Sequence, residues 1–515
     1  MTQSPWHFDI RPRDTHNETL MTSVHPADWR SPTPEPMYNL VVIGAGTAGL
    51  ISAIGCAALG GKVALVERHL MGGDCLNVGC VPSKCLIRSS RAAGEMAGAA
   101  RFGLTPHRVT PSDFPTVMER MRRLRAGISH NDSARRYSEM GVHVFFGEAA
   151  FAGRNTVTVG EMSLSFKKAI IAAGARAVRP DIPGLDDVGF QTNETVFNLT
   201  ELPRRLVVIG GGPIGCELAQ AFSRLGSEVT IVQHTRFLPR EDPEASALLA
   251  RVFAREGIRI VLDARPVCVE KAERGKRVTV RTGEGEQTIE ADEILIGAGR
   301  QPNLEGLDLE KAGVAYDPRK GIRVDDFLRT TNETIFAAGD VCMDWKFTHA
   351  ADAAARIAVQ NALFRGRKRL SALNMPWCTY TDPEIAHVGL SAAEAQARGI
   401  AIDTYTVAMG EVDRAIADGE TEGFIKILVK KGTDRIVGAT IVAAHAGDLI
   451  SEITVAMAGN LGLKTLADVI HPYPTQAEAI RRVAAAYNRT RLTPRVAALL
   501  KWWLGWQRRT KKLYG

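Results

Sequence analysis

Cys75 and Cys80 are the residues whose spacing most clearly indicates chemistry. They stand in residues 72–84 (GGDCLNVGCVPSK), with four residues between them. Two thiols at this spacing can form a disulfide if the first turn of a helix brings them together, and a helix N-terminus would stabilise their thiolates. A metal site would need a second pair of ligands, but the other six cysteines are scattered singly. The pattern therefore predicts redox-active thiols and no metal site.

A glycine-rich loop precedes this cysteine pair and has the spacing of a dinucleotide site. In residues 38–67 an apolar strand is followed by Gly44, Gly46 and Gly49, an Ala-rich helix, and a second strand ending at Glu67. The first glycine permits a tight turn, the second lets the backbone approach a pyrophosphate, and the third lets the helix pack on the strand. The phosphates would lie at the helix N-terminus, and Glu67 would hold ribose hydroxyls.

A second copy of this unit occupies residues 204–233. Its glycines are Gly210, Gly212 and Gly215, and its second strand ends at Gln233, followed by His234 and Arg236. An acidic residue at the strand end would hold a 2′-hydroxyl and repel a 2′-phosphate. The lack of an acidic residue here, together with the nearby cations, favours NADPH over NADH. The alternative is that His234 and Arg236 are ordinary surface residues.

The elements that must position these residues predict an α/β fold class. Two βαβ units about 165 residues apart imply two Rossmann-like dinucleotide-binding domains. After residue 375 the chain has alternating apolar segments and then an amphipathic helix near residues 447–461. These features predict a C-terminal α+β domain with an antiparallel sheet.

The composition is that of a folded globular protein. The 515 residues are 45% hydrophobic and 23% charged, which excludes a disordered chain and a collagen. Eight cysteines are too few for a secreted disulfide framework, and the opening residues lack the apolar segment of a signal peptide. No apolar run approaches the ~20 residues that span a bilayer. We therefore expect a cytoplasmic protein, and a net charge of +7 does not by itself indicate nucleic acid binding.

Residues 38–482 resemble the flavoprotein disulfide reductases, the class I pyridine nucleotide-disulfide oxidoreductases. Residues 72–84 are similar to the family's redox-active signature. The resemblance implies that the first glycine loop binds FAD and the second binds NAD(P)H. Residues 331–340 (TNETIFAAGD) resemble a second FAD motif, and residues 298–303 (AGRQPN) resemble another family segment. These matches add four expected cofactor-binding residues: Gly174, Gly299, Gly339 and Asp340.

The resemblance also assigns roles to the cysteines and their neighbours. Cys80 would lie against the isoalloxazine as a thiolate, and Cys75 would be the interchange thiol that meets the substrate. Lys84 would lie near the flavin and pair with Glu217, because a cation there stabilises reduced, anionic flavin. A solvated Lys84 remains the alternative.

The C-terminal segment departs from the common pattern of the family. In most members a His before Pro-Thr protonates the leaving thiolate, and an acidic residue orients this His. Here residues 471–478 read HPYPTQAE, which puts Tyr473 at that position and Glu478 at the acid. A phenol with a pKa near ~10 is a poor proton shuttle. A buried interface aromatic remains the other interpretation of Tyr473.

This segment is similar to mercuric reductase-like members, in which a Tyr lies at the metal. Against that likeness, the sequence has no cysteine after Cys378 and no N-terminal metal-carrier pair. The resemblance implies an FAD-dependent NAD(P)H oxidoreductase that reduces a thiol/disulfide or thiophilic metal acceptor. It also implies a homodimer in which Tyr473 and Glu478 act across subunits. A dihydrolipoyl dehydrogenase-like enzyme and a low-turnover membrane-associated redox flavoprotein are the alternatives.

The expected organisation along the chain follows from these motifs. It comprises an N-terminal extension without periodicity (1–37), an FAD-binding domain in two parts (38–190 and 311–375), an NAD(P)-binding domain (191–310), a dimerisation domain (376–490) and a basic aromatic tail (491–515). The tail carries three of the seven Trp residues. Peripheral membrane contact through residues 495–515 and docking of this segment as a helix on the dimer or the FAD domain both remain open.

Overall fold

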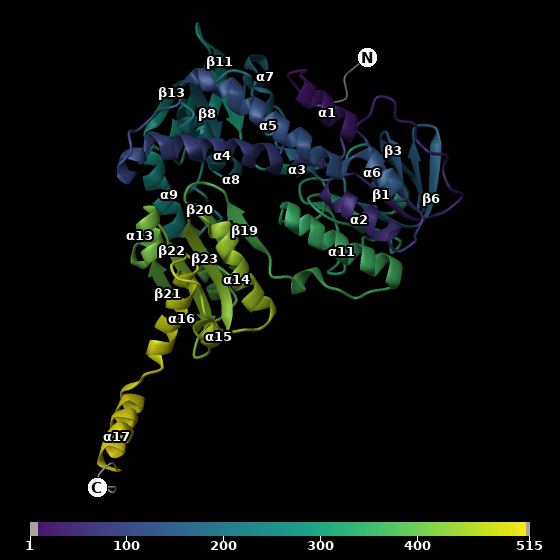
Figure 1. Ribbon diagram of the computed structural model, residues 1–515. Coiled ribbons are helices and arrows are strands. Elements are labelled where there is room, and N and C mark those ends of the chain that lie inside the picture. Colours follow the sequence, from purple (N-terminus) through teal and green to yellow (C-terminus); the bar gives the residue numbers. More distant parts are fainter. Residues whose placement is uncertain (1–8, 511–515) are drawn as a thin grey trace. The chain divides into compact units, whose positions relative to one another are not determined.

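The computed structural model describes residues 9–510, which fall into two compact units (Figure 1). The first unit comprises the chain through Pro239 and Val252–Leu373, and the second comprises Arg240–Arg251 and the chain from Asn374 onward. Residues 1–8 of the predicted extension and 511–515 of the predicted tail lie outside the described residues. The predicted α/β fold class is confirmed. The domain boundaries stay predictions.

The first unit contains a seven-stranded sheet with the order β3-β2-β1-β6-β5-β4 and with β18 beside β6. Its parallel strands are β1 (Tyr38–Ile43), β2 (Val63–Glu67), β3 (Val142–Phe146), β6 (Met162–Ile171) and β18 (Ile335–Ala337). Strands β4 (Ala149–Gly153) and β5 (Thr156–Val159) continue it antiparallel. Strand β1 is almost wholly buried, as a parallel strand covered on both faces must be. Helices α2 (Thr47–Ala57) and α11 (Thr348–Phe364) pack on each other and on this sheet.

A second, four-stranded parallel sheet repeats the same plan. Its order is β10 (Arg259–Val261), β9 (Glu228–Val232), β8 (Arg205–Ile209) and β14 (Glu293–Ile296). Helix α8 (Pro213–Arg224) follows β8 as α2 follows β1. An antiparallel sheet of β11 (Arg265–Lys271), β12 (Lys276–Thr282) and β13 (Gly285–Ala291) shares a hydrophobic core with it, and β7 (Ala175–Ala177) pairs with β15 (Arg300–Pro302).

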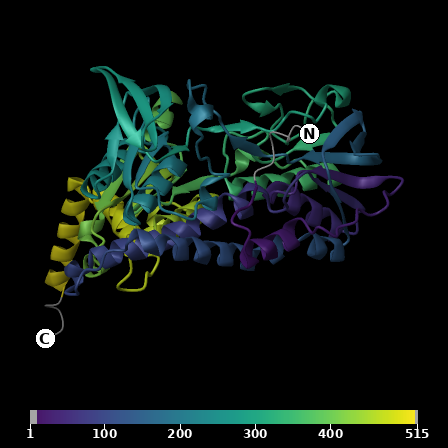
Figure 2. The same ribbon diagram turned by 90° about the horizontal axis from the view of Figure 1, so that it is seen from above.

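Long helices join these sheets around the cysteine pair. Helix α3 (Gly73–Asn77) leads into α4 (Cys80–Ala97), which packs against α5 (Phe114–Ser129) and α8. Helices α4 and α5 lie side by side in both views (Figure 1, Figure 2). Shorter helices of this unit are α6 (Ala134–Glu139), α7 (Leu185–Val188) and α10 (Leu309–Ala312). Helix α9 (Pro243–Arg255) begins in the segment Arg240–Arg251 of the second unit and ends in the first.

The N-terminal extension differs from the expectation that it lacks periodicity. It holds helix α1 (Thr15–Val24), which the Asp14 side chain caps. The helix buries Asn17, Leu20 and Val24, which recur at helical spacing on one face. The pattern is hard to see in the sequence because two aliphatic residues and an amide make up the whole buried face.

The second unit is built on a five-stranded antiparallel sheet. Its order is β19 (Pro376–Thr379), β20 (Glu384–Gly389), β23 (Ile436–Ala443), β22 (Phe424–Lys430) and β21 (Ile402–Ala408). Helices α14 (Ala446–Ala458) and α16 (Glu478–Thr490) share its core. The other helices are α12 (Ala392–Ala397), α13 (Asp413–Asp418), α15 (Leu463–Asp468) and α17 (Pro494–Thr510).

Within residues 9–510, no helix is both long enough and apolar enough to cross a bilayer.

Candidate functional site

The cysteine pair lies where α3 meets α4 in the first unit. Cys75 is half-buried on α3, and Cys80 is the exposed first residue of α4. Gly73 presses this segment against the first glycine loop, because a Cβ on Gly73 would lie 2.6 Å from the Gly46 Cα. The redox segment and the predicted pyrophosphate loop therefore lie in direct backbone contact.

The two thiols differ in acidity. The Cys75 thiol donates a hydrogen bond to the Cys80 sulfur, and this bond is the largest cause that lowers the pKa of Cys80. Together with the Thr348 hydroxyl, 3.2 Å from the Cys80 Sγ, and the charge of Lys84, it lowers this pKa to about 6. The same bond and burial raise the pKa of Cys75. At neutral pH the pair therefore holds one thiolate, at Cys80, and one thiol, at Cys75.

Lys84 lies one turn after Cys80 on α4 and forms an ion pair with α8. Its Nζ is 2.7 Å from Glu217 Oε2, and the Glu217 side chain is only 7% exposed. This contact joins the segment that carries the cysteines to the helix that follows the second glycine loop. The structure thus brings Cys75, Cys80, Lys84 and Glu217 together.

The first glycine loop has the shape that a pyrophosphate requires. Cβ atoms on Gly44 and Gly49 would collide with backbone oxygens at 2.4 and 1.7 Å, whereas one on Gly46 would meet nothing closer than 3.8 Å. The Gly46 face at the N-terminus of α2 is therefore open, as a phosphate-binding backbone must be. Glu67 is buried and accepts a hydrogen bond from the Ala45 N–H at 2.7 Å. These residues fit FAD.

The second glycine loop repeats this geometry at equivalent positions. Cβ atoms on Gly210 and Gly215 would collide with backbone at 2.7 and 2.0 Å, and one on Gly212 would meet no atom within 4 Å. Gln233 takes the place of Glu67, because its Oε1 accepts a hydrogen bond from the Gly211 N–H at 2.9 Å. A neutral amide thus stands where the first loop has a carboxylate. These residues fit a pyridine nucleotide.

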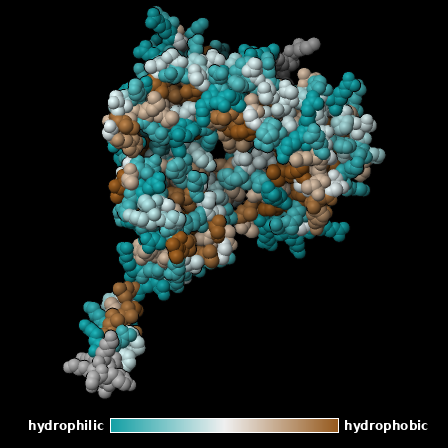
Figure 3. Space-filling model, in the orientation of Figure 1, coloured by the Kyte–Doolittle hydropathy of each residue, from teal (hydrophilic) through white to brown (hydrophobic). Residues whose placement is uncertain are grey.

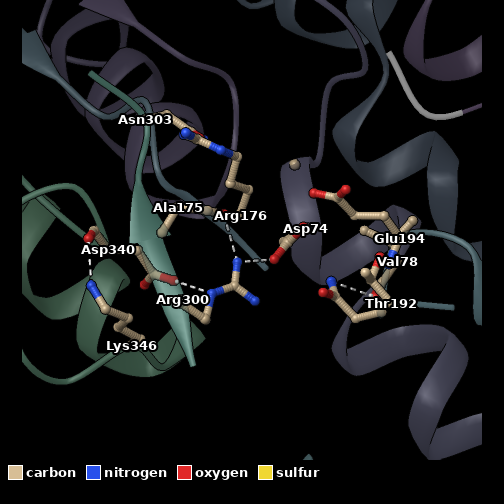
Figure 4. Close-up of polar contacts among 12 residues, drawn as sticks. Asp74, Val78, Ala175, Arg176, Thr192, Glu194, Arg300, Asn303, Asp340 and Lys346 are labelled. Atoms are coloured by element: carbon tan, nitrogen blue, oxygen red, sulfur yellow. Dashed lines mark hydrogen bonds and ion pairs between the residues drawn. The ribbon is translucent and has the colours of Figure 1, made fainter. Parts of the chain in front are cut away.

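A half-buried arginine connects the cysteine segment with the second FAD motif. Figure 4 shows Arg300 pointing toward Asp74, the residue before Cys75, with which it forms an ion pair. Its Nε lies 3.3 Å from Asp340 Oδ2, and its Nη2 donates to the Ala175 carbonyl at 2.7 Å. Burial would lower the pKa of Arg300, but the two carboxylates raise it instead. Burial, with the charge of Asp74, also raises the pKa of Glu194.

The remaining residues predicted for the cofactor surround this arginine. Gly174 accepts a hydrogen bond from the Asn303 N–H at 3.0 Å, and Gly299 directly precedes β15. Gly339 and Asp340 follow β18, and burial raises the pKa of Asp340. The sequence indicated residues 298–303 only as a family segment and assigned no role to Asp74 or Thr348, which the fold brings in from distant parts of the chain.

Tyr473 and Glu478 belong to the second unit. The Tyr473 hydroxyl donates to Asp413 Oδ2 at 3.0 Å, and this bond raises the pKa of the exposed phenol. Glu478 begins α16, where Arg481 lies 3.0 Å from Oε1; within residues 9–510, no group donates a hydrogen bond to the buried Oε2. His471 contacts Glu452 at 2.9 Å instead. Placement of Tyr473 and Glu478 beside a partner's cysteine pair stays a prediction.

Two family models match the chain. Residues 38–355 match the pyridine nucleotide-disulphide oxidoreductase family, and residues 375–484 match the dimerisation domain of that family. The second match indicates a homodimer, the assembly that this domain forms in the family.

Individual relatives and structures agree with these matches. The chain is 35% identical to a mercuric reductase of Streptomyces lividans and 34% identical to a dihydrolipoyl dehydrogenase of Staphylococcus aureus. These alignments cover 88% and 87% of this chain and 96% of each relative. Among solved structures, the Cu(II) complex of the HOCl-induced flavoprotein disulfide reductase RclA from Escherichia coli has a TM-score of 0.78 and 28% identity, and the match covers 88% of this chain and all of that one.

Proposed function

Because the chain belongs to the pyridine nucleotide-disulphide oxidoreductase family, we propose that it is an FAD-dependent NADPH oxidoreductase that reduces a thiophilic acceptor through Cys75 and Cys80. The observation that carries this proposal is the surroundings of Cys80: Cys75 and the Thr348 hydroxyl contact its sulfur, and these contacts and the charge of Lys84 lower its pKa and so favour a thiolate. A thiolate is the reactive form in thiol–disulfide exchange and in metal binding.

The two glycine loops supply the cofactor sites in this proposal. FAD, when bound, would relay two electrons from the nicotinamide to the cysteine pair. Gly46 and the N-terminus of α2 would hold its pyrophosphate, and Glu67 its ribose. Gly212 and α8 would hold NADPH. Gln233 supports NADPH because its neutral side chain would not repel a 2′-phosphate, and the exposed His234 and Arg236 follow it.

The overall reaction balances around the cysteine pair. NADPH becomes NADP⁺ as it gives up two electrons and one proton, and the Cys75–Cys80 disulfide takes these two electrons and this proton to become the Cys75 thiol and the Cys80 thiolate. The dithiol then returns two electrons to the acceptor and closes to the disulfide again. The acceptor is one Hg(II), which becomes Hg(0), or two Cu(II), which become Cu(I), with release of one proton.

A soft metal ion is the acceptor class that the second unit favours. Reduction of an organic disulfide needs a group that protonates the leaving thiolate. The hydrogen bond to Asp413 raises the pKa of Tyr473, which makes its phenol a weaker acid and less suited to that role. Reduction of a metal ion needs no such proton. Relatives are mercuric reductases, and a structural neighbour was solved with Cu(II). We therefore favour Hg(II) or Cu(II), in the cytoplasm.

A disulfide acceptor such as lipoamide is the second candidate. The identity to a dihydrolipoyl dehydrogenase, 34%, is almost the same as that to the mercuric reductases. The buried Glu478 Oε2 supports this candidate, because it could accept a hydrogen bond from an acid–base group. Since Tyr473 is a weak substitute for that group, we expect slow turnover with lipoamide.

Steady-state oxidation of NADPH by the FAD-loaded protein tests the proposal with Hg(II), Cu(II), lipoamide and glutathione disulfide in parallel. Cys75→Ser and Cys80→Ser are each expected to lower kcat with the best acceptor at least about 100-fold, because the dithiol can no longer form. Cys85→Ser is the matched control, since Cys85 lies on the same helix α4 and burial raises the pKa of its thiol. Full activity of Cys75→Ser would refute the assigned route.

A further inference from the structure

Helix α17 (Pro494–Thr510) presents its apolar side chains to solvent. Among its residues through Arg508, only Ala497 and Gly505 are partly covered, and none is buried. The exposed apolar residues are Val496, Leu499, Leu500, Trp502, Trp503, Leu504 and Trp506. Figure 3 shows hydrophobic and hydrophilic side chains on different sides of this helix. So large an apolar face on a single helix marks an interaction surface.

The sequence separates the apolar and charged residues around the helix axis. Val496, Leu500 and Trp503 recur at spacings of four and three, so they lie along one face, and Leu499 and Trp506 flank it. Lys501 and Arg508 are seven residues apart and project from the opposite face. Helix α17 is therefore amphipathic: Trp503 and Trp506 lie on or beside the apolar face and Lys501 and Arg508 lie opposite it, whereas Trp502 and Arg495 lie together at its border.

The net charge of the whole chain resides in this segment. Residues 491–515 contain seven of the 64 basic residues and none of the 57 acidic ones. The other 490 residues therefore carry 57 basic and 57 acidic side chains, which cancel. An anionic surface is therefore attracted to this segment.

We propose that α17 binds the surface of an anionic lipid bilayer. Tryptophan rings are favoured at the level of lipid headgroups, and the long side chains of lysine and arginine reach anionic headgroups from beside the apolar face. Each basic residue near such a surface strengthens binding about fivefold. The helix lies in the interface plane, since it does not have the length and hydropathy to span.

A second copy of the chain fits this face less well than anionic lipid does. Residues matched by the dimerisation model end at 484, ten residues before α17 begins. Packing of two α17 helices would also bring together segments that contain only positive charges. Anionic lipid is complementary to the segment in both charge and apolarity.

Co-sedimentation of the FAD-loaded, full-length protein with vesicles tests this proposal. Vesicles of phosphatidylcholine containing 30% phosphatidylglycerol are expected to bind the protein at least about 10-fold more tightly than pure phosphatidylcholine vesicles. The difference is expected to shrink at 0.5 M salt, because salt screens the attraction. Equal, weak binding to both kinds of vesicle would overturn the proposal.

Two variants separate the contributions of the two faces. Trp502→Ala/Trp503→Ala/Trp506→Ala and Lys501→Glu/Arg508→Glu are each expected to weaken binding to anionic vesicles at least 10-fold. The matched control, Lys430→Glu/Lys431→Glu, reverses two exposed charges in the same unit and is expected to leave binding unchanged. If the tryptophan variant binds vesicles normally but changes the oligomeric state by light scattering, the face is an interface between copies and the proposal is wrong.

Discussion

At the scale of single residues, Thr348 is the partner of the cysteine pair whose effect is simplest to measure. Its hydroxyl lies 3.2 Å from the Cys80 Sγ, with no covalent or charge role of its own. A hydrogen bond to a charged group is worth about 1.5–3 kcal/mol, which corresponds to about one to two pKa units. Thr348 therefore contributes to the fall in the pKa of Cys80 to about 6, after the larger contribution of the Cys75 thiol.

Replacement of Thr348 by Val is expected to raise the pKa of Cys80 toward that of an ordinary thiol. In the two-electron-reduced, FAD-loaded enzyme, long-wavelength absorbance requires the thiolate, so it should appear as pH rises through about 6 in the wild type. In Thr348→Val the midpoint should move upward by at least one unit. Thr348→Ser, which keeps the hydroxyl, is expected to titrate like the wild type. An unchanged midpoint in Thr348→Val would contradict this role.

Arg300 is expected to contribute to stability through the two carboxylates that it neutralises. Arg300→Met would leave the partly buried Asp74 without its ion-pair partner and Asp340 with only the charge of Lys346 nearby, a loss of about 3–5 kcal/mol in the free energy of unfolding. Arg179→Met is the control, because its ion pair with Asp186 is exposed and should contribute below about 1 kcal/mol. Urea unfolding measures both variants. Equal midpoints for the two would contradict the structural role of Arg300.

At the scale of elements, local spacing explains which parts of the site could be predicted. The glycines of both loops and the cysteines lie within short segments, where strand, turn and helix follow each other in order. Arg300 and Asp74 are 226 residues apart, and Thr348 and Cys80 are 268 apart, so no local pattern connects them. Helix α1 was missed for a different reason, because its buried face contains an amide in addition to aliphatic residues.

Helix α1 is connected to the cysteine segment by a buried arginine on α5. Arg125 is fully buried, and its guanidinium donates to the Asn77 carbonyl of α3 at 2.6 Å and to Asn17 Oδ1 of α1 at 2.8 Å. Burial lowers the pKa of Arg125 to about 10, so it remains charged at neutral pH. Through Arg125, the N-terminal segment is thus joined by hydrogen bonds to the chain between Cys75 and Cys80.

Removal of this connection is expected to destabilise both helices. Arg125→Met leaves two buried acceptors without donors and should lower the free energy of unfolding by about 2–4 kcal/mol. Limited proteolysis should then cut residues 9–37 faster than in the wild type. Arg123→Met, an exposed position on the same helix, is expected to change neither measurement. Unaltered cleavage in Arg125→Met would show that other contacts hold α1, namely its apolar face and the ion pair of its N-cap Asp14 with Arg122.

At the scale of the whole molecule, the match to the dimerisation domain raises the question of which subunit's cysteine pair Tyr473 and Glu478 act on. If they act on the cysteine pair of the partner, a subunit with Cys75→Ser and a subunit with Tyr473→Ala/Glu478→Ala have complementary defects. A mixed dimer then has one site that carries all the substitutions and one site that is intact. If both subunits are produced in equal amounts, half of the dimers are mixed, so about a quarter of the wild-type activity should return.

Co-expression of the two variants with different affinity tags measures this recovery directly. Mixed dimers purified through both tags are expected to have about half of the wild-type kcat per dimer, because one of two sites is complete. Each parent homodimer should be nearly inactive, and a mixed dimer of wild type and Cys75→Ser should also show one half. If the complementary pair stays inactive while this control is half-active, Tyr473 and Glu478 serve the cysteines of their own chain, and each subunit is a complete catalytic unit.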